Sequence, residues 1–587
     1  MSLPDLPRRA LLLDDARPGG ASVLFRDPID WIVATTPDEA LAALARIDAA
    51  VAGGLWVAGS FAFELGYLLE PKLRPLYRQP GDPLIAIGTY EKRVPVGGAA
   101  LAAKFSDRPA AALGSAEPSL DFAGYEKRFT RVRDYIAAGD VYQINLTFPL
   151  SLPVAGDPLA RLVAWRAYAR AGHAAILRLD DRDVFSFSPE LFLAAEGDGV
   201  IRARPMKGTA RRAPDANGEA DAKAALQTDP KQRAENLMIV DLLRNDLSRV
   251  CEAGSVKVTD LFTVETYPTL HTMTSGIEGR LRPGLAPSEI LRALFPCGSV
   301  TGAPKVRAME IIAETEASPR GFYCGAIGAF GPGGEIDLNV AIRTLVHEHG
   351  AARLRMGVGG GLVYDSKARS EYAECLLKAR FAASEPFELL ETLRWEPDAG
   401  YVFLEEHIGR LARAAAYFLF PYDERVVLAA LEDHATHAEP RRVRLRLAAT
   451  GEALVESAAL GEMKGPLRLA VAATRVASDD PFARHKTTRR AVYDAALAEA
   501  KALGADEAIL LNEHGRVADG SFTTLFVLKD GALLTPPVSE GALDGILKRV
   551  LAGRSIVETP LTLNDLRSAE ALYAGNSVRG LFLAVLV

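Results

Sequence analysis

The sequence is poor in cysteine, has no long apolar run and carries no excess of positive charge. Its four cysteines, Cys251, Cys297, Cys324 and Cys375, are scattered, without a CxxC pair or zinc-finger spacing. This usage excludes a disulfide framework and is typical of a reducing, cytoplasmic compartment. Because no run of about 18 apolar residues occurs, no membrane-spanning helix is predicted. The first apolar run, Ala10–Leu13, is too short for a signal peptide.

Lysine and arginine together number 68 against 75 acidic residues, which gives a net charge of -7. This balance argues against nucleic acid or an anionic membrane as the main partner, although it allows a local basic pocket for an anionic metabolite. A chain of 587 residues exceeds one hydrophobic core, so several domains are expected. The 49% hydrophobic and 24% charged content is ordinary for a soluble globular protein.

The spacing of apolar residues predicts a mixed α/β chain. The pattern restarts near Ser384-Glu385-Pro386, so we expect a first domain of residues 1–383 and a second of residues 384–587. Residues 95–118 are rich in Ala, Gly and Pro and are expected to form an exposed connection before a core of residues 121–383. Strands are predicted over 31–34, 55–63, 141–148, 325–330, 338–346 and 354–356, and helices over 38–51, 125–138, 232–250, 370–383, 405–418 and 488–503.

One lysine stands in a constrained setting, the hexapeptide Arg204-Pro205-Met206-Lys207-Gly208-Thr209. The apolar alternation before it predicts a strand end, and Pro205 and Gly208 restrict the backbone on both sides of Lys207. A pocket that lowered the pKa of this lysine from its usual ~10.4 would make the neutral amine a nucleophile. For these six residues alone, a solvated lysine at a strand end is the more economical interpretation.

A second cluster lies on the predicted helix after the run Gly359-Gly360-Gly361. Glu371, Glu374 and Lys378 share one helical face, because residues three and four apart are neighbours there. Two carboxylates can hold Mg²⁺ together with water and substrate oxygens, and Glu235 on an earlier helix could oppose them. A glycine-rich turn would present bare backbone N–H groups to a ligand. A salt-bridged, solvent-exposed helix face is the simpler alternative for this helix alone.

Residues 120–383 resemble the chorismate-utilising enzymes, which include anthranilate, aminodeoxychorismate, isochorismate and salicylate synthases. The resemblance is specific because several segments match in order, and residues 1–120 match only weakly. It implies an α/β (α+β) fold in which helices cover two large β-sheets. The matching segments are Ser188–Glu190, Arg204–Thr209, Arg233–Asp246, His271–Ser275, Gly302–Lys305, Ala341–Thr344, Gly359–Gly361 and Glu371–Glu374.

The same resemblance implies roles for individual residues. Mg²⁺ would lie between Glu235 and Glu374, with Glu371 close by, and would hold the ring carboxylate of chorismate. His271 would lie against the ring. A dianionic substrate would explain why a net-acidic protein gathers cationic groups in one cavity. The remaining contacts to chorismate would come from Thr209, Tyr323, Arg343, Lys378 and the amides of Gly359, Gly360 and Gly361.

Lys207 separates members of this family. Anthranilate synthases usually carry alanine at this position, whereas aminodeoxychorismate synthases carry a lysine that attacks C2 of chorismate and expels the C4 hydroxyl. Glu190 resembles the acid that protonates the departing oxygen. Ammonia would then add at C4 and release the lysine. Since no glutaminase motif accompanies these segments, ammonia is expected from solution or, by analogy, from a separate glutamine amidotransferase subunit.

The informative string of the second half is His485-Lys486-Thr487-Thr488-Arg489-Arg490. A lysine beside further cations has a depressed pKa and suits covalent chemistry with carbonyl groups, although the string alone also fits a basic helix start. With Glu406–Leu411, Asp506–Asn512 and Asp519–Phe526 it resembles the fold-type IV pyridoxal-phosphate enzymes over residues 386–587. That resemblance implies a two-subdomain fold and is compatible with a homodimer formed through this half.

By this resemblance Lys486 would bear pyridoxal 5'-phosphate. Arg410 and the backbone around Ile546 and Leu547 would hold its phosphate, and Thr392 would lie over its face.

Two positions depart from this pattern. Asp519 stands where a glutamate usually pairs with the pyridine nitrogen, and it is shorter by roughly 1.3 Å. The cofactor or the strand must therefore shift to meet it. Thr524 stands where an asparagine is common.

We therefore predict a bifunctional enzyme of 4-aminobenzoate (folate precursor) synthesis. The first half would aminate chorismate to 4-amino-4-deoxychorismate with Mg²⁺, and the second would eliminate pyruvate with pyridoxal phosphate. One alternative is an anthranilate- or salicylate-type synthase fused to a branched-chain or D-amino-acid aminotransferase, and Lys207 argues against it. The other is a synthase with a non-catalytic second half, which Asp519 and Thr524 permit.

Overall fold

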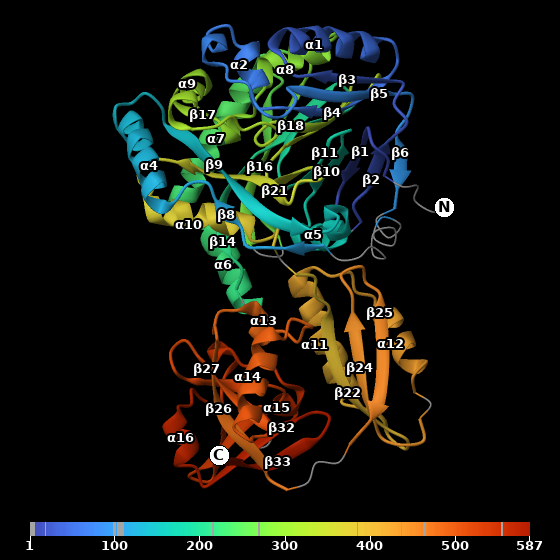
Figure 1. The fold of residues 1–587 in the computed structure, drawn as a ribbon, viewed down its shortest axis with the longest axis vertical. Coiled ribbons are helices and arrows are strands. Elements are labelled where there is room, and N and C mark those ends of the chain that lie inside the picture. The colour runs from blue at the N-terminus through green and yellow to red at the C-terminus, as the bar shows by residue number, and fades with distance from the viewer. Residues whose placement is uncertain are drawn as a thin grey trace. The chain divides into compact units, whose positions relative to one another are not determined.

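The structure is a computed structural model that describes residues 6–17, 19–97, 101, 111–213, 216–267, 270–383, 385–435, 437–461, 465–552 and 556–587. The chain divides into two compact units, Met1–Arg212 with Asp221–Glu385, and Ala213–Ala220 with Pro386–Val587. Each unit contains two β-sheets and several helices, as Figure 1 shows. The predicted α/β class, with two large sheets in the first half, is confirmed.

The first sheet of unit 1 has 11 antiparallel strands in the described chain, and its 13-residue strand β9 lies near one edge. Strands at the centre of the sheet, such as β10 and β11, are largely buried, so they read as apolar runs. In order across the sheet the strands are β17 (Gly302–Ala303), β9 (Gln143–Ala155), β21 (Arg353–Leu362), β20 (Thr344–Glu348), β11 (Arg182–Ser188), β10 (His173–Arg178), β1 (Ala10–Asp14), β2 (Ser22–Phe25) and β6 (Val94–Val96), and β7 (Ala112–Leu113) and β8 (Glu117–Pro118) also pair with β9.

The second sheet of unit 1 has 10 strands in the described chain. It brings β14, which contains Lys207, beside β16, and it continues to the N-terminal strands β3, β4 and β5 at its other end. In order the strands are β14 (Met206–Arg211), β16 (Leu270–Arg280), β13 (Val200–Arg204), β12 (Leu191–Glu196), β19 (Glu335–Val340), β18 (Ala326–Phe330), β4 (Trp56–Phe61), β5 (Ile85–Tyr90) and β3 (Asp30–Ala34), and β15 (Lys257–Thr266) also pairs with β16.

Helix α1 (Pro37–Ala52) shows how a helix of unit 1 is specified. Thr36 and Glu39 form a capping box at its start, and Ala40, Ala43, Leu44 and Ile47 are buried at helical spacing. This face packs against α8, β3 and β4 (Figure 1). The other helices of this part of the chain are α2 (Leu65–Leu69), α4 (Phe122–Ala137), α5 (Leu162–Ala169), α6 (Ala216–Thr228), α7 (Pro230–Ser248), α8 (Pro287–Leu294), α9 (Lys305–Thr315) and α10 (Ala368–Ala379).

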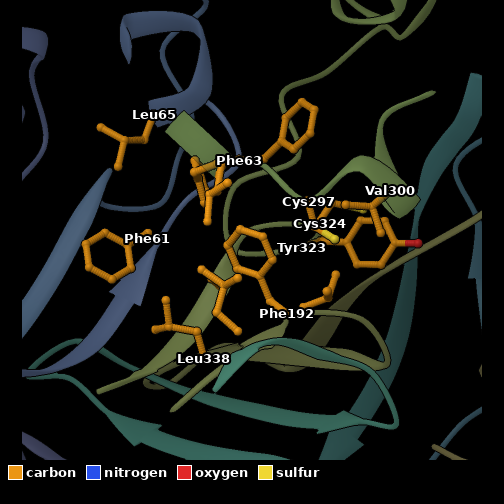
Figure 2. Close-up of a cluster of buried hydrophobic side chains, with 14 of the residues drawn as sticks. Phe61, Phe63, Leu65, Phe192, Cys297, Val300, Tyr323, Cys324 and Leu338 are labelled. Atoms are coloured by element: carbon orange, nitrogen blue, oxygen red, sulfur yellow. The ribbon is translucent and has the colours of Figure 1, made fainter. Parts of the chain in front are cut away.

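A buried aromatic cluster joins the N-terminal strands to the rest of unit 1. Phe61 packs edge-on against Phe295 and Phe330, with ring centroids 6.5 and 6.3 Å apart. Figure 2 shows Tyr323 at the edge of this cluster with its hydroxyl pointing away from Phe61 and Phe63. Residues 1–120, which the sequence resemblance matched weakly, thus contribute to the same core as the later strands.

Two segments differ from the sequence prediction. The strand predicted over 338–346 is two strands, β19 and β20, because Arg343 between them adopts φ +50°. The glycine run predicted as a turn lies inside β21, where Gly359, Gly360 and Gly361 pair with residues 145–147 of β9. The prediction of a glycine-rich turn was therefore wrong, because glycine here provides close approach of side chains to a strand.

Unit 2 consists of a small and a larger subdomain. The small sheet is ordered β23 (Gly400–Val402), β22 (Leu389–Glu396), β24 (Arg441–Leu447) and β25 (Ala453–Ala459), and α11 (Leu404–Phe418) and α12 (Glu424–Glu432) cover one of its faces. The larger sheet is ordered β28 (Val517–Gly520), β27 (Glu507–Asn512), β26 (Leu467–Val476), β33 (Gly580–Leu586), β32 (Ala571–Asn576), β29 (Thr524–Lys529), β30 (Ala532–Thr535) and β31 (Ile556–Glu558), and its helices are α13 (Pro481–Arg484), α14 (Ala491–Ala502), α15 (Ile546–Leu551) and α16 (Leu563–Arg567).

Candidate active site

Lys207 lies at a β-bulge. The register between β14 and β16 shifts between Met206 and Thr209, and Gly208 adopts φ +89° at this point. A Cβ atom on Gly208 would lie 2.8 Å from Oε1 of Gln232, so both the backbone angle and the space require glycine. The bulge re-aims the side chain of Lys207 relative to a regular strand.

The amine of Lys207 occupies space that a glycine of β21 leaves open. A Cβ atom on Gly361 would lie 2.6 Å from Nζ of Lys207 and 2.9 Å from Nε2 of Gln143. Burial lowers the pKa of Lys207, and the charge of Lys378 lowers it further, against the opposing effect of Glu190 and other carboxylates. The lysine is half-buried and favours its neutral form more than a solvated lysine does.

Glu190 is a buried acid beside this lysine. Only 4% of its surface is exposed, and its Oε1 atom accepts no hydrogen bond from the part of the chain described. Burial raises the pKa of Glu190 to about 7, although a hydrogen bond from Ser299 and the charge of Lys207 act in the opposite direction. Near neutral pH a substantial fraction of this carboxyl group is therefore protonated and able to donate a proton.

The three predicted metal ligands lie on α7 and α10, and their charges act on one another. Burial raises the pKa values of Glu235 and Glu371, and the neighbouring carboxylates raise them further. Glu374 forms an ion pair with Lys378 over 2.9 Å. Burial alone would raise the pKa of Glu374, but Lys378 and Lys207 reverse this effect, so its pKa is lowered.

Within the described ranges, no three His, Cys, Asp or Glu side chains approach closely enough to hold a metal ion. Glu235, Glu371 and Glu374 lie close enough for their charges to act on one another, and Glu374 is paired with Lys378 in this structure. These carboxylates fit a hard cation, since Mg²⁺ takes one or two carboxylates and completes its shell with water and substrate oxygens.

The residues predicted to bind substrate differ in burial and in hydrogen-bond partners. Arg343 is half-buried, and among the described residues no carboxylate pairs with its guanidinium, whose pKa burial lowers. Lys378 donates a hydrogen bond of 2.9 Å to the carbonyl of Gly359. The ring of Tyr323 packs where a Cβ atom on Gly357 would stand, 2.2 Å away. Thr209 is exposed on β14.

His271 and Gln143 complete the surroundings. His271 is buried on β16, with Nδ1 3.1 Å from Oγ1 of Thr266. Gln143 is 1% exposed, and within the described part of the chain its Nε2 atom has no hydrogen-bond partner. The sequence pattern predicted Gln143 only as a member of a strand. The available signal was a row of alternating polar residues, Gln143, Asn145 and Thr147, on one face of that strand.

In unit 2, Lys486 lies between the two subdomains. Its carbonyl accepts a hydrogen bond of 2.9 Å from the N–H of Leu390, at the start of β22. Burial lowers the pKa of Lys486 to about 7, and the charges of Arg410, Arg490 and Arg444 act in the same direction. A lysine with this pKa is in substantial part a free amine at neutral pH, as covalent chemistry with a carbonyl requires.

Arg410 is held by a buried carboxylate. Its Nε and Nη2 atoms donate to Glu391 over 2.8 and 2.6 Å, and Nη1 donates to the carbonyl of Asp544 over 3.0 Å. His407 also contacts Glu391, at 2.6 Å from Nδ1. These contacts fix the guanidinium and leave part of its donor capacity for an anion such as a phosphate group.

Asp519 is a buried carboxylate whose hydrogen bonds come from the backbone N–H groups of Gly520 and Leu543, over 3.1 and 3.0 Å. Burial raises the pKa of Asp519 to about 7. No ion pair of Asp519 is found among the described residues, so this carboxylate fits a cationic partner such as a protonated pyridine nitrogen.

Three further predicted cofactor contacts lie around this group. Ile546 and Leu547 are buried at the start of α15, and Thr392 is half-buried on β22. Thr524 packs against Gly545, where a Cβ atom would lie 2.9 Å from its hydroxyl. The chemistry of this donor set therefore fits pyridoxal phosphate.

A search of the described helices finds none that is long and apolar enough to cross a membrane.

The chain matches two protein families along its length. The model of the chorismate binding enzymes matches residues 10–384, and that of the class IV amino-transferases matches residues 388–585. Aminodeoxychorismate synthase component 1 of Escherichia coli (strain K12) is 43% identical over 250 residues, which are 43% of this chain and 54% of that protein. Anthranilate synthase component 1 3 of Haloarcula marismortui is 40% identical over 275 residues, which are 47% of this chain and 54% of that protein.

The chain thus spans about half the length of these curated relatives. Among solved structures, anthranilate synthase component I from Streptococcus pneumoniae TIGR4 superposes with a TM-score of 0.52 at 25% identity and covers 65% of this chain and 94% of its own. Because the first family model spans more than half of the sequence, the chain belongs to the chorismate binding enzymes, with a class IV amino-transferase domain following in the same polypeptide.

Proposed function

We propose that this chain converts chorismate to 4-aminobenzoate in two steps, one in each half. The observation that carries the proposal is the environment of Lys207, a half-buried amine whose pKa is lowered and which lies near the buried acid Glu190. An anthranilate-type reaction needs no amine nucleophile from the protein, whereas amination at C4 by way of a covalent lysine intermediate does.

In the first step the neutral amine of Lys207 forms a bond to C2 of chorismate while the C4–O bond breaks. Glu190, partly protonated at neutral pH, gives its proton to the departing oxygen, which leaves as water. Ammonia then forms a bond to C4, and the bond between C2 and Lys207 breaks. The lysine is regenerated, and the product is 4-amino-4-deoxychorismate.

Glu235 and Glu374, with Glu371 close by, would hold Mg²⁺ in this proposal, and the bound ion would supply a Lewis acid for the ring carboxylate. Arg343 and Lys378 provide positive charge for the substrate, because Arg343 has no carboxylate partner among the described residues. Thr209, Tyr323, His271 and the glycines of β21 shape the remaining wall. Ammonia comes from a separate glutamine amidotransferase subunit, by analogy with the component 1 relatives.

In the second step Lys486 and Arg410 would hold the cofactor, and pyridoxal 5'-phosphate would supply an electron sink when bound. Asp519 would provide a negative charge for its pyridine nitrogen. The amine of Lys486 takes the proton from C4 of 4-amino-4-deoxychorismate, and a proton is returned to the departing enolpyruvyl group. The products are pyruvate and the aromatic 4-aminobenzoate.

Product analysis tests both steps together. Purified protein is supplied with chorismate, Mg²⁺, ammonium and pyridoxal phosphate, and the products are separated by chromatography. The proposal requires 4-aminobenzoate and pyruvate in equal amounts. Formation of 2-aminobenzoate would overturn the first step, and accumulation of 4-amino-4-deoxychorismate without pyruvate would overturn the second step and support a non-catalytic second half.

A further inference from the structure

Strand β24 presents three arginines on one face of the small sheet. Its burial pattern alternates, so that the apolar residues between the arginines face α11 and α12 while the arginines face the other way. The arginines are Arg442, Arg444 and Arg446, and the buried residues are Val443, Leu445 and Leu447.

Arg446 and Arg444 differ in whether a carboxylate pairs with the guanidinium group. Arg446 forms ion pairs with Glu388 and Glu456, over 2.9 and 3.1 Å. Glu456 lies directly opposite Arg444 in the ladder with β25, yet its carboxylate reaches diagonally to Arg446. Among the residues that the structure describes, the guanidinium of Arg444 has no ion pair and no hydrogen bond. Its charge is left for a ligand.

The position of Arg444 connects it to the reactive lysine. Across the ladder with β22, Arg444 lies opposite Thr392, two residues after Leu390, whose N–H donates to the carbonyl of Lys486. The charge of Arg444 also contributes to the lowered pKa of Lys486, which places the two side chains within electrostatic reach of each other. The strand that carries Arg444 therefore pairs with the strand whose first residues are hydrogen-bonded to the reactive lysine.

We propose that Arg444 binds a carboxylate of the substrate whose amine reacts at Lys486, and that it selects substrates with a carboxylate remote from that amine. This inference rests on the function proposed for the second half. The intermediate 4-amino-4-deoxychorismate carries two carboxylates, and 4-aminobenzoate keeps the one on the ring, opposite its amine. A guanidinium suits this group because it can donate two parallel hydrogen bonds to a carboxylate.

Equilibrium dialysis of 4-aminobenzoate against the full chain, saturated with pyridoxal phosphate, tests this role. Arg444→Gln should weaken binding by about 10- to 100-fold, the range expected for losing a charge-assisted hydrogen bond. Arg442→Gln is the matched control, because Arg442 is also exposed on this face but lies opposite Arg394. It should change binding by less than about twofold. 4-Aminobenzamide, which lacks the carboxylate, should bind the native chain and Arg444→Gln equally.

Equal weakening in both variants, parallel loss of 4-aminobenzamide binding, or no binding of 4-aminobenzoate to the native chain would overturn the role of Arg444. The proposed reaction is tested separately by the products formed from chorismate. If the native chain made no 4-aminobenzoate but Arg444→Gln alone lost affinity for the carboxylate, the reaction would be wrong and the carboxylate site would stand.

Discussion

A Cβ atom on Gly361 would lie 2.6 Å from Nζ of Lys207, closer than two non-bonded atoms can stand. The bare backbone of β21 thus provides the space in which this amine sits. The neighbouring Gly360 faces other groups, and a Cβ atom there would meet the flexible end of Glu371 at 3.3 Å. A methyl group at Gly361 must therefore displace the Lys207 amine, whereas a methyl group at Gly360 requires only a small shift of Glu371.

Gly361→Ala should therefore displace the Lys207 amine and lower the rate of chorismate amination by about 10²-fold, the cost of a misplacement of roughly 1 Å. Gly360→Ala is the matched control and should lower the amination rate by a smaller factor, since the Glu371 side chain can move by a few tenths of an ångström. Steady-state rates and melting temperatures of both variants check this expectation. A larger loss in Gly360→Ala would contradict it.

Lys207→Ala should abolish formation of 4-amino-4-deoxychorismate, because it removes the amine that forms the proposed covalent bond to C2. Chromatography of reactions with chorismate, Mg²⁺ and ammonium measures the product. Lys257→Ala, which changes an exposed lysine elsewhere on the second sheet, serves as the control and should retain activity. Full activity in Lys207→Ala would refute the assignment of the nucleophile.

The amination rate should fall as the pH rises through about 7, because burial raises the pKa of Glu190 to about 7 and only the protonated carboxyl can donate. Toward lower pH the rate should also fall, as the Lys207 amine becomes protonated. Measuring kcat between pH 5 and 9 (about that range) defines both limbs. Glu190→Gln should be slow throughout and lack the alkaline limb, so an unchanged alkaline limb in that variant would argue against Glu190 as the acid.

Glu391→Gln should destabilise unit 2 by about 3–5 kcal/mol, because it leaves the buried guanidinium of Arg410 without its counter-charge. The pKa of Glu391 lies at about 2 because the effects of Arg410 and His407 outweigh burial, which acts to raise it. A depressed carboxyl pKa contributes stability that is present above pH 4.5, the ordinary value, and is lost as the pH falls toward 2.

Denaturant unfolding of this variant checks the expected loss. Glu456→Gln, which removes a partly exposed pair with Arg446, should cost no more than about 1 kcal/mol. Similar losses of unfolding free energy in the two variants would show that the buried ion pair of Glu391 and Arg410 stabilises the protein no more than an exposed pair does.

Asp519→Asn should weaken retention of pyridoxal phosphate by at least about tenfold, since the buried carboxylate then provides no negative charge for a pyridine N–H. The asparagine keeps one acceptor oxygen for the N–H of either Gly520 or Leu543, and its NH₂ group faces the other N–H, so the melting temperature of the variant is measured alongside. Cofactor content after dialysis, read from the absorbance of bound pyridoxal phosphate, measures the effect. Undiminished retention would place the pyridine nitrogen elsewhere.

Much of the fold could be predicted from local patterns. The helix that begins after Thr36 has both a capping signal and helical spacing of its buried residues, so its extent was evident from the sequence. The backbone conformation of Arg343 was harder to predict, because no neighbouring residue indicates a φ of +50° at this position. That conformation divides one apolar run into two strands. The run Gly359–Gly361 was wrongly predicted as a turn for a related reason, since glycine occurs both in turns and in strands against which other groups pack closely.

The residues of the candidate site could be predicted from the sequence better than the contacts between their side chains. Lys207, Glu190 and Glu371 stand out by residue type and order, but the ion pair between Lys378 and Glu374 depends on side-chain positions that spacing does not fix. Gln143 was missed because alternating polar residues in a strand usually face solvent, and only its burial next to Gly361 distinguishes it.

The backbone hydrogen bond from Leu390 to Lys486 links the reactive lysine of the second half to the first strand of the small sheet. Damage that loosens this sheet would therefore shift the lysine together with Thr392 and with Glu391, which holds Arg410. Such damage would stop only the second of the two proposed reactions, so an unfinished intermediate would accumulate while chorismate continued to be consumed.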